Sequence, residues 1–327
     1  MNVEYTYEVS VCITTYNMEK YIGRALKSVL VQKTDFNFEI IVTDDASTDA
    51  TIEIVKDFQS KAGKEIKLLT AEANEGVTKN LAKALKASRG KYIALLDADD
   101  YWISANKLQL QVDHLNSHTE TGYVYTNYYH ENEETKQRVI AFANNYVHPD
   151  DKAYETMLTT NFIQPSNTCF RASLVDETRL NVFIENDFRI LDYCLFLDFA
   201  LRSRGAYLPA ITTVYTHRQG SMSRENDYEK KVSNYLHSYK IGNYFIKQKP
   251  IDASLVNRRK FNYQFNLLMA AWQYGTYSDV KKQATSISED DIKRYNPKAL
   301  YVYYASRNRL LYTVVKPWLL RKRKFGK

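Results

Sequence analysis

Short apolar runs alternate with helical stripes of apolar residues along the first hundred residues of the chain. Runs rich in β-branched and aliphatic residues predict four buried strands, at residues 9–14, 39–43, 66–70 and 91–96. Between the runs, apolar residues recur at every third or fourth position, which predicts helices over residues 17–32, 50–60 and 77–90. Gly90 is expected to cap the last of these helices. Repeated strand–helix units predict an α/β fold, with a mostly parallel sheet flanked by helices.

The pattern in the rest of the chain is less regular but still indicates both kinds of element. Residues 161–174 fit a short loop followed by a strand, and residues 211–217 fit another strand. Between these segments, apolar residues recur on one face of a helix that ends before Gly205. Residues 226–327 are rich in Tyr and are expected to be helical.

Polar side chains follow each of the four predicted strands at its carboxyl end. They are Thr14 with Tyr16, Asp44 with Asp45, Asn74 with Gly76, and Asp97 with Asp99 and Asp100. Open α/β sheets bind ligands at this edge. Each group alone also fits ordinary turn or capping chemistry, as Asp49 does before the second helix. Four groups on one edge are harder to explain by local turns, so the edge is the predicted site.

The run Ala94–Trp102, "ALLDADDYW", holds three carboxylates, and no Lys or Arg lies between Lys91 and Lys107. Like charges this close need a counter-charge. The glycine-rich phosphate-binding motifs GxGxxG after the first strand and GxxxxGK[ST] are absent from the sequence. Carboxylates are hard ligands that suit Mg²⁺ or Mn²⁺, and such ions keep positions open for phosphate oxygens. The sequence therefore predicts a divalent ion with a diphosphate on its other side. The alternative is a solvated acidic turn that caps a helix near Ser104.

Composition narrows the class of protein. A hydrophobic content of 44% is typical of globular chains. No apolar run approaches the ~18 residues of a membrane span, and the amino terminus has no basic start followed by an apolar stretch, as a secretory signal would. The cysteines fit neither a zinc site nor a disulfide framework, because they are far apart: Cys12, Cys169 and Cys194. A reducing, cytoplasmic compartment is the simplest expectation.

Charge divides the chain into two parts. Residues 1–225 hold 24 Lys and Arg against 31 Asp and Glu, whereas residues 226–327 hold 21 against 7. The basic part ends "VVKPWLLRKRKFGK", and basic residues beside Trp and Leu suit an anionic membrane surface, here the inner face of the membrane. A solvated basic tail fits equally well, and a homodimer contact is a further option. No nucleic-acid partner is expected, because no motif that reads nucleic acid is present.

Three sequence blocks, at residues 9–32, 38–51 and 74–100, resemble the family 2 glycosyltransferases of the GT-A fold in their order and spacing. They read "VSVCITTYNMEKYIGRALKSVLVQ", "FEIIVTDDASTDAT" and "NEGVTKNLAKALKASRGKYIALLDADD". Residues 190–223 resemble the acceptor-side segment of the family more loosely. The resemblance implies a Rossmann-like GT-A catalytic domain over residues 1–225 and a helical C-terminal region over residues 226–327. The catalytic domain would divide into a nucleotide-binding half (1–102) and an acceptor-binding half (103–225).

The resemblance further implies inverting, metal-assisted transfer of a sugar from a nucleotide-sugar, usually a UDP-sugar, to a glycan or lipid-linked saccharide. Asp97 and Asp99 match the family's DxD motif, in which Asp99 would bind Mn²⁺ or Mg²⁺ and Asp97 the ribose or the ion through water. Asp192 matches the catalytic base, although helix capping is an alternative role for it, and Glu185 and Asp187 are substitutes. The nucleotide would contact Thr14, Tyr16, Asp44, Asp45, Asn74, Gly76, Lys79, Asp97 and Ala98.

Five further side chains are candidates for the ion, the diphosphate or the acceptor. His217 would complete the metal site or touch the diphosphate, and a loop hydrogen bond fits it equally well. Arg218 and Ser221 would meet phosphate oxygens, since the guanidinium fork suits them. Gln164 would bind sugar hydroxyls, although turn chemistry around Pro165 also explains it. Glu185 would flank the acceptor.

Two other classes of protein remain as alternatives. A sugar-1-phosphate nucleotidyltransferase also uses an α/β sheet and a divalent ion, but it would carry a Gly-rich loop with Arg and Lys where this chain reads "TTYNMEK". A non-catalytic module that binds a nucleotide or a carbohydrate would not need the acidic motifs that this chain retains.

Overall fold

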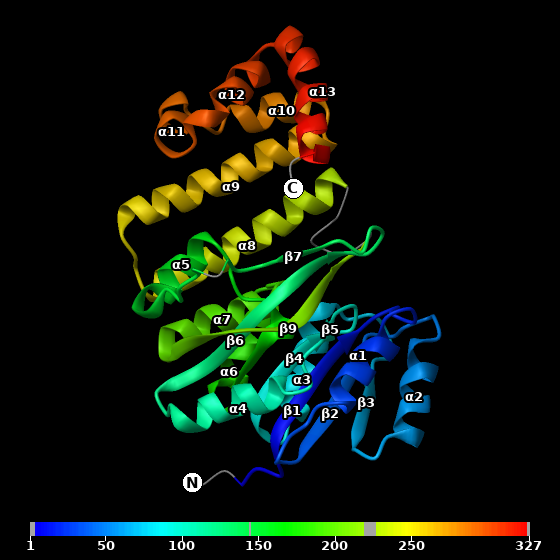
Figure 1. Ribbon diagram of the computed structural model, residues 1–327. Coiled ribbons are helices and arrows are strands. Elements are labelled where there is room, and N and C mark those ends of the chain that lie inside the picture. Colours follow the sequence, from blue (N-terminus) through cyan, green and yellow to red (C-terminus); the bar gives the residue numbers. More distant parts are fainter. Residues whose placement is uncertain (1–3, 144, 219–226, 326–327) are drawn as a thin grey trace. The chain divides into compact units, whose positions relative to one another are not determined.

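The computed structural model describes residues 4–143, 145–218 and 227–325. Contacts divide the chain after Arg218 into two compact units. The first unit contains one nine-stranded sheet flanked by helices, and the second is helical (Figure 1). Over the described residues, no helix combines the length and the apolar character that crossing a membrane would require.

The sheet has the strand order β3-β2-β1-β4-β8-β6-β9-β5, with β7 paired to β6. The strands are β1 (Tyr7–Thr15), β2 (Phe38–Asp44), β3 (Ile66–Thr70), β4 (Gly90–Asp97), β5 (Tyr101–Trp102), β6 (Thr121–Asn132), β7 (Arg138–Ile140), β8 (Thr168–Arg171) and β9 (Arg204–His217). The first four strands are parallel, and β6 and β9 share their direction, whereas β5, β7 and β8 run the opposite way. The expected α/β fold with a mostly parallel sheet is therefore confirmed.

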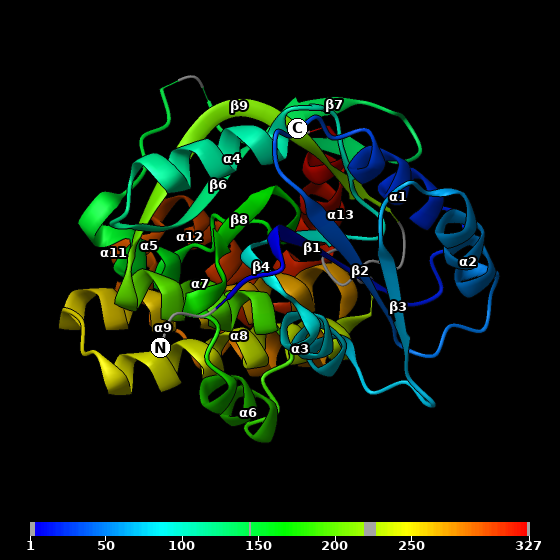
Figure 2. The ribbon, with the colours of Figure 1, turned by 90° about the horizontal axis from the view of Figure 1, so that it is seen from below.

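Helices cover both faces of the sheet, as Figure 2 shows: α1, α2 and α4 lie on one face and α3, α6 and α7 on the other. The apolar stripe of α1 and the alternate residues of β1, β2 and β4 that face it form one continuous core. The helices of this unit are α1 (Ile22–Leu30), α2 (Thr51–Lys61), α3 (Val77–Ala87), α4 (Lys107–Ser117), α5 (Ala153–Thr159), α6 (Glu177–Glu185) and α7 (Leu191–Arg202).

Two details of the predicted elements are wrong. The first helix begins at Ile22 rather than at residue 17, because Asn17 has a positive φ of 52° and belongs to the turn after β1. Gly90 does not cap α3, which ends at Ala87, but opens β4. A Cβ at Gly90 would lie 2.4 Å from the backbone nitrogen of Ser10. The glycine is therefore required by close strand packing rather than by a turn.

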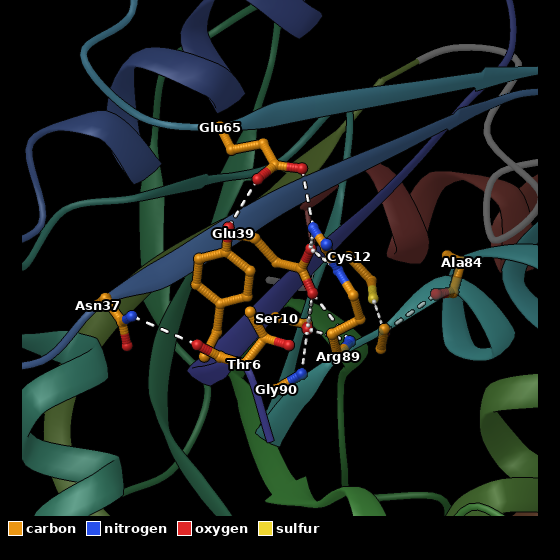
Figure 3. Close-up of polar contacts among 11 residues, drawn as sticks. Thr6, Ser10, Cys12, Asn37, Glu39, Glu65, Ala84, Arg89 and Gly90 are labelled. Carbon is orange, nitrogen blue, oxygen red and sulfur yellow. Dashed lines mark hydrogen bonds and ion pairs between the residues drawn. The ribbon is translucent and has the colours of Figure 1, made fainter. Parts of the chain in front are cut away.

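A polar cluster around Glu39 holds the amino-terminal rim of β1, β2 and β4 (Figure 3). The buried Glu39 carboxylate accepts hydrogen bonds from Ser10 Oγ (2.7 Å), from the backbone N–H of Arg89 (2.8 Å) and from the Arg89 guanidinium (2.8 Å). Ser10 Oγ in turn accepts the backbone N–H of Gly90 at 2.8 Å. A buried carboxylate with this many donors is compensated for its lost hydration, so it fixes the alignment of three strands.

Lys107, the first residue of α4, is fully buried. Its Nζ donates to Gln111 Oε1 at 2.7 Å and lies 4.2 Å from the centroid of the Trp102 ring. Burial lowers the pKa of Lys107 to about 7, because the charged ammonium is disfavoured in an apolar surrounding.

We expect Lys107→Met to stabilise the protein at pH 6 and to lose that advantage by pH 10. Unfolded Lys has a pKa of about 10.4, so between pH 7 and 10 the unfolded chain binds more protons and wild-type stability rises with pH. Below pH 7 the cost of the buried ammonium is present in full. The variant also leaves the Gln111 oxygen without a donor, which lowers the benefit. The free energy of unfolding at pH 6 should then increase by on the order of 2 kcal/mol. Urea unfolding at both pH values measures it, and an equal loss of stability at both would contradict the expectation.

The second unit consists of the helices α8 (Tyr228–Gln248), α9 (Ala253–Tyr274), α10 (Tyr277–Ala284), α11 (Glu289–Tyr295), α12 (Leu300–Arg307) and α13 (Arg309–Phe325). Its core gathers apolar side chains from α9 to α12, among them Leu268, Trp272 and Val302. Trp272 donates its indole N–H to Ser306 Oγ at 2.8 Å, so its one polar atom is satisfied inside that core. The helical C-terminal extension expected from the sequence is confirmed.

Candidate functional site

The acidic cluster lies where β4 ends, at the carboxyl edge of the sheet. Asp97 is the last residue of β4 and pairs in register with Thr14 of β1, whose Oγ1 donates to Asp97 Oδ1 at 3.3 Å. Ala98 is buried, and its N–H donates to the carbonyl oxygen of Thr14 at 3.2 Å. The pairing of β1 with β4 therefore brings together Thr14, Asp97 and Ala98 from two of the predicted groups.

Asp100 acts as an internal link in the cluster. Its buried carboxylate accepts a hydrogen bond from Ser166 Oγ at 2.6 Å and from the backbone N–H of Thr216 at 2.8 Å. Ser166 Oγ also accepts the backbone N–H of Asp97 at 3.1 Å. Burial, with the charges of Asp99 and Asp97, raises the pKa of Asp100 well above its ordinary value. Asp100 thus ties β4 to β9 and to the 3₁₀ helix at Pro165–Asn167.

Asp192 contributes a further carboxylate from a distant part of the chain. It is the second residue of α7, and burial raises the pKa of its carboxyl group. Burial and the charges of Asp99 and Asp192 raise the pKa of Asp97 to about 7. Because Asp192 acts on Asp97 in this way, the start of α7 lies near the end of β4. The carboxyl edge therefore combines carboxylates that repel one another.

Two arginines supply part of the counter-charge that the sequence left open. Arg218 Nε donates to Asp99 Oδ2 at 2.7 Å, and the Arg24 guanidinium donates to the Asp99 carbonyl oxygen at 3.0 Å. Arg24 also reaches Thr216 Oγ1 at 3.1 Å. No basic residue is near Asp99 in the sequence, but the fold brings two to it: Arg24 from α1 and Arg218, which follows β9. Asp99 therefore has a cationic partner in the protein itself.

His217, the last residue of β9, lies against another histidine. Its Nε2 is 2.8 Å from His130 Nδ1, and the two rings are stacked with centroids 4.9 Å apart. Within the described residues, no three or more His, Cys, Asp or Glu side chains gather as ligands for a metal ion. Metal binding by His217 stays a prediction.

At the end of β2, Asp44 and the following Asp45 shape the loops at the carboxyl edge. Both are buried. The Asp45 oxygens accept the backbone N–H groups of Glu75 (2.8 Å) and Gly76 (2.9 Å), and Asp44 accepts the N–H of Ser47 at 2.8 Å. Gly76 precedes α3 with a φ of +90°, a conformation that favours glycine. Each oxygen of Asp45 keeps a lone pair for a ligand.

The other predicted nucleotide contacts are accessible. Tyr16 is 42% exposed. Asn74 and Lys79 are exposed as well, with Lys79 Nζ 3.9 Å from the Glu75 carboxylate. One residue of this edge was missed: Asn80 is buried and donates to the carbonyl oxygens of Thr15 and Thr43. The sequence does hold a signal for this residue, because Asn80 interrupts the apolar face of the helix predicted over residues 77–90.

The predicted acceptor-side residues do not all gather at the cluster. Gln164 is half-buried and hydrogen-bonds to Tyr128, whose pKa is raised by burial and by the nearby charge of Asp100. Glu185 and Asp187 are exposed, and among the described residues neither makes a hydrogen bond or ion pair with the acidic cluster. Ser221 lies outside the described residues.

Asp198 lies two turns into α7, where a surface or salt-bridge residue is expected. It is buried and pairs with Arg179 (2.5 Å) and Arg202. Two guanidinium groups compensate the buried charge, so the salt-bridge alternative is confirmed.

Comparisons with known proteins identify the family and the fold of the chain. The family profile "Glycosyl transferase family 2" matches residues 10–179, more than half of the chain. An uncharacterized protein of Mycobacterium tuberculosis is 30% identical over 212 residues, which cover 63% of this chain and 58% of that protein. The UDP-Glc:alpha-D-GlcNAc-diphosphoundecaprenol beta-1,3-glucosyltransferase WfgD of Escherichia coli is 40% identical over 122 residues, 37% of this chain and 46% of the enzyme. The chain thus matches about half the length of these curated relatives.

The fold is shared with a solved structure. The crystal structure of S. aureus TarS 1-349 in complex with UDP has a TM-score of 0.60 with this chain, at 17% identity, and the match covers 98% of this chain and 92% of that one. Because the identity is low, this likeness concerns the fold alone. Together with the family profile, it means that the chain belongs to glycosyl transferase family 2 and has the GT-A fold.

Proposed function

We propose that the chain transfers a sugar from a UDP-sugar to a glycan or lipid-linked saccharide, with inversion at the anomeric carbon. The observation that carries the proposal is that Asp192 lies near Asp97, so that the charge of Asp192 helps to raise the pKa of Asp97. A lone carboxylate beside a nucleotide-binding edge is what an acceptor hydroxyl needs as a base. The printed activity of WfgD, from UDP-Glc to a diphosphoundecaprenol-linked sugar, supports this class of donor and acceptor.

The donor nucleotide would lie along the carboxyl ends of β1 to β4. Asp45 would accept a hydrogen bond from the nucleobase, and Asp44 would support the loop of Asp45. Asn74, Gly76 and Lys79 would line the nucleobase or the ribose. The exposure of Tyr16 and Lys79 supports this role, since a ligand can reach both. The remaining contacts would be made by Thr14, Asp97 and Ala98.

The donor set of the acidic cluster fits a divalent ion. Asp97 is buried beside the charges of Asp99 and Asp192, which together raise its pKa. A cation stabilises oxygen ligands in such a place, and one or two carboxylates suffice for Mg²⁺ or Mn²⁺. Asp99 would hold the ion with help from Asp97, and His217 is a further candidate. When bound, the ion would supply Lewis-acid stabilisation of the diphosphate leaving group. Arg218 would then give up its hydrogen bond to Asp99 and donate to phosphate oxygens instead.

Asp192 would take the proton of the acceptor hydroxyl. Burial raises its pKa, which makes the carboxylate a stronger base than an exposed Asp. Gln164, with Glu185 at the rim, would orient the acceptor hydroxyls. The exposed position of Glu185 suits an acceptor contact better than proton transfer in a closed site.

A donor screen with the full chain tests this function. UDP release from UDP-glucose and UDP-N-acetylglucosamine is followed with Mn²⁺, with and without a GlcNAc-diphospho-lipid acceptor. We expect release that requires the acceptor, and a product whose anomeric configuration is opposite to that of the donor. Donor binding without turnover across a broad donor and acceptor set would favour a non-catalytic binding module instead, and retained configuration would exclude inversion.

A further inference from the structure

The helix α13 of the second unit has two apolar faces. On one face Tyr312, Val315 and Leu319 pack against the hydrophobic core of that unit. The other face carries apolar side chains that remain in contact with solvent: Leu310 (79% exposed), Leu311 (46%), Val314 (73%) and Trp318 (45%). The packing of the unit accounts for the first face and leaves the second exposed.

The exposed face continues onto the neighbouring helix α12. Tyr301 is 41% exposed, and its ring meets the Trp318 ring edge to face, with centroids 5.4 Å apart. We call Leu310, Leu311, Val314, Trp318 and Tyr301 the exposed patch. Trp and Tyr combine an apolar ring with a polar tip, and they are enriched at the boundary between lipid and water.

The chain segment that carries the exposed patch is strongly basic in sequence. From Ile292 onward the sequence holds eleven Lys and Arg and no Asp or Glu, and four of the basic residues occupy consecutive positions 321–324. Two copies of the chain that met through this patch would bring these like charges together. An anionic surface would be attracted to each copy, so the charge favours a surface of that sign as the occupant.

We propose that the exposed patch and the basic residues beside it dock the chain onto an anionic lipid bilayer. The patch would enter the boundary between headgroups and acyl chains, while Lys and Arg contact the headgroups. Stable docking takes two signals, here the apolar patch and the basic residues of the same segment. The inference does not depend on sugar transfer, although a lipid-linked acceptor would lie in the same surface.

Vesicle binding by the full chain, without donor or acceptor, tests the inference separately from catalysis. The vesicles are phosphatidylcholine alone or phosphatidylcholine with about 30% phosphatidylglycerol. Trp102 and Trp272 are buried, so a blue shift of the fluorescence on binding reports on Trp318. We expect at least about tenfold stronger partitioning to the anionic vesicles, and a decrease at high salt.

The double variant Leu310→Ser/Val314→Ser should bind the anionic vesicles at least about tenfold more weakly. Both side chains are exposed, so the variant should keep the thermal unfolding of the wild type. The matched control is Val147→Ser, because Val147 is a similarly exposed valine (77%) of the first unit, and it should bind as the wild type does. Wild-type binding by the double variant would overturn the inference, as would equal binding to both vesicles. A lipid-free oligomer that the double variant dissociates would assign the patch to a second copy instead.

Discussion

Asp192→Asn lowers the rate of sugar transfer by at least about a thousandfold and leaves the affinity for UDP within about threefold of the wild type. The amide has the shape of the carboxylate but cannot accept the hydroxyl proton. The position at the start of α7 is unchanged, and Asn there still accepts the backbone N–H of Tyr193. Single-turnover kinetics with a UDP-sugar measure the chemical step, and calorimetry with UDP measures binding.

The matching variant is Asp187→Asn. Asp187 has a φ of 51°, which Asn tolerates, and it is exposed. We expect this variant to transfer sugar at a rate close to that of the wild type. If it lost turnover and Asp192→Asn kept most of it, the base would have to be reassigned to the loop that precedes α7.

Asp99→Asn abolishes the gain in UDP affinity that Mn²⁺ gives the wild type, which we expect to exceed about tenfold. Without Mn²⁺, wild type and variant should bind UDP alike, because the retained amide oxygen can still accept from Arg218 at this position. Calorimetric titrations of UDP with and without Mn²⁺ separate the two contributions.

Asp57→Asn provides the control for charge. Asp57 is an exposed carboxylate of α2 that pairs with Lys61, far from the acidic cluster in the fold. Its removal changes the net charge as Asp99→Asn does, and the gain with Mn²⁺ should persist. Unchanged Mn²⁺-dependent affinity in Asp99→Asn would remove Asp99 from the ion-binding role.

The fold was predictable because its signals are local. The runs that form β1 to β4 and the stripe that forms α1 can be read within a few residues. The carboxyl edge followed from the parallel order of those strands. Gly90 was misassigned because a glycine suits both a helix cap and a close contact between strands, and only the nearness of Ser10 shows that the second applies here.

The partners of the site were not predictable, because they come from distant segments. Arg24 on α1 and Arg218 after β9 meet at Asp99, and no spacing in the sequence indicates that meeting. Ser166 lies in a short 3₁₀ helix next to Pro165, in a segment whose polar residues ordinary turn chemistry also explains. Its bonds to the acidic cluster depend on how β8 aligns with β4, which is a property of the whole sheet.

Glu39 and Asp97 lie at opposite rims of the sheet and differ in how well their carboxylates are satisfied. Glu39 has a donor for each oxygen, whereas Asp97 faces further carboxylates. Repulsion between carboxylates is thus strong around Asp97, while the charge of Glu39 is compensated. A ligand cation would relieve the repulsion around Asp97 without disturbing the Glu39 cluster, so the strand alignment would stay fixed while the proposed donor site takes up its ligand.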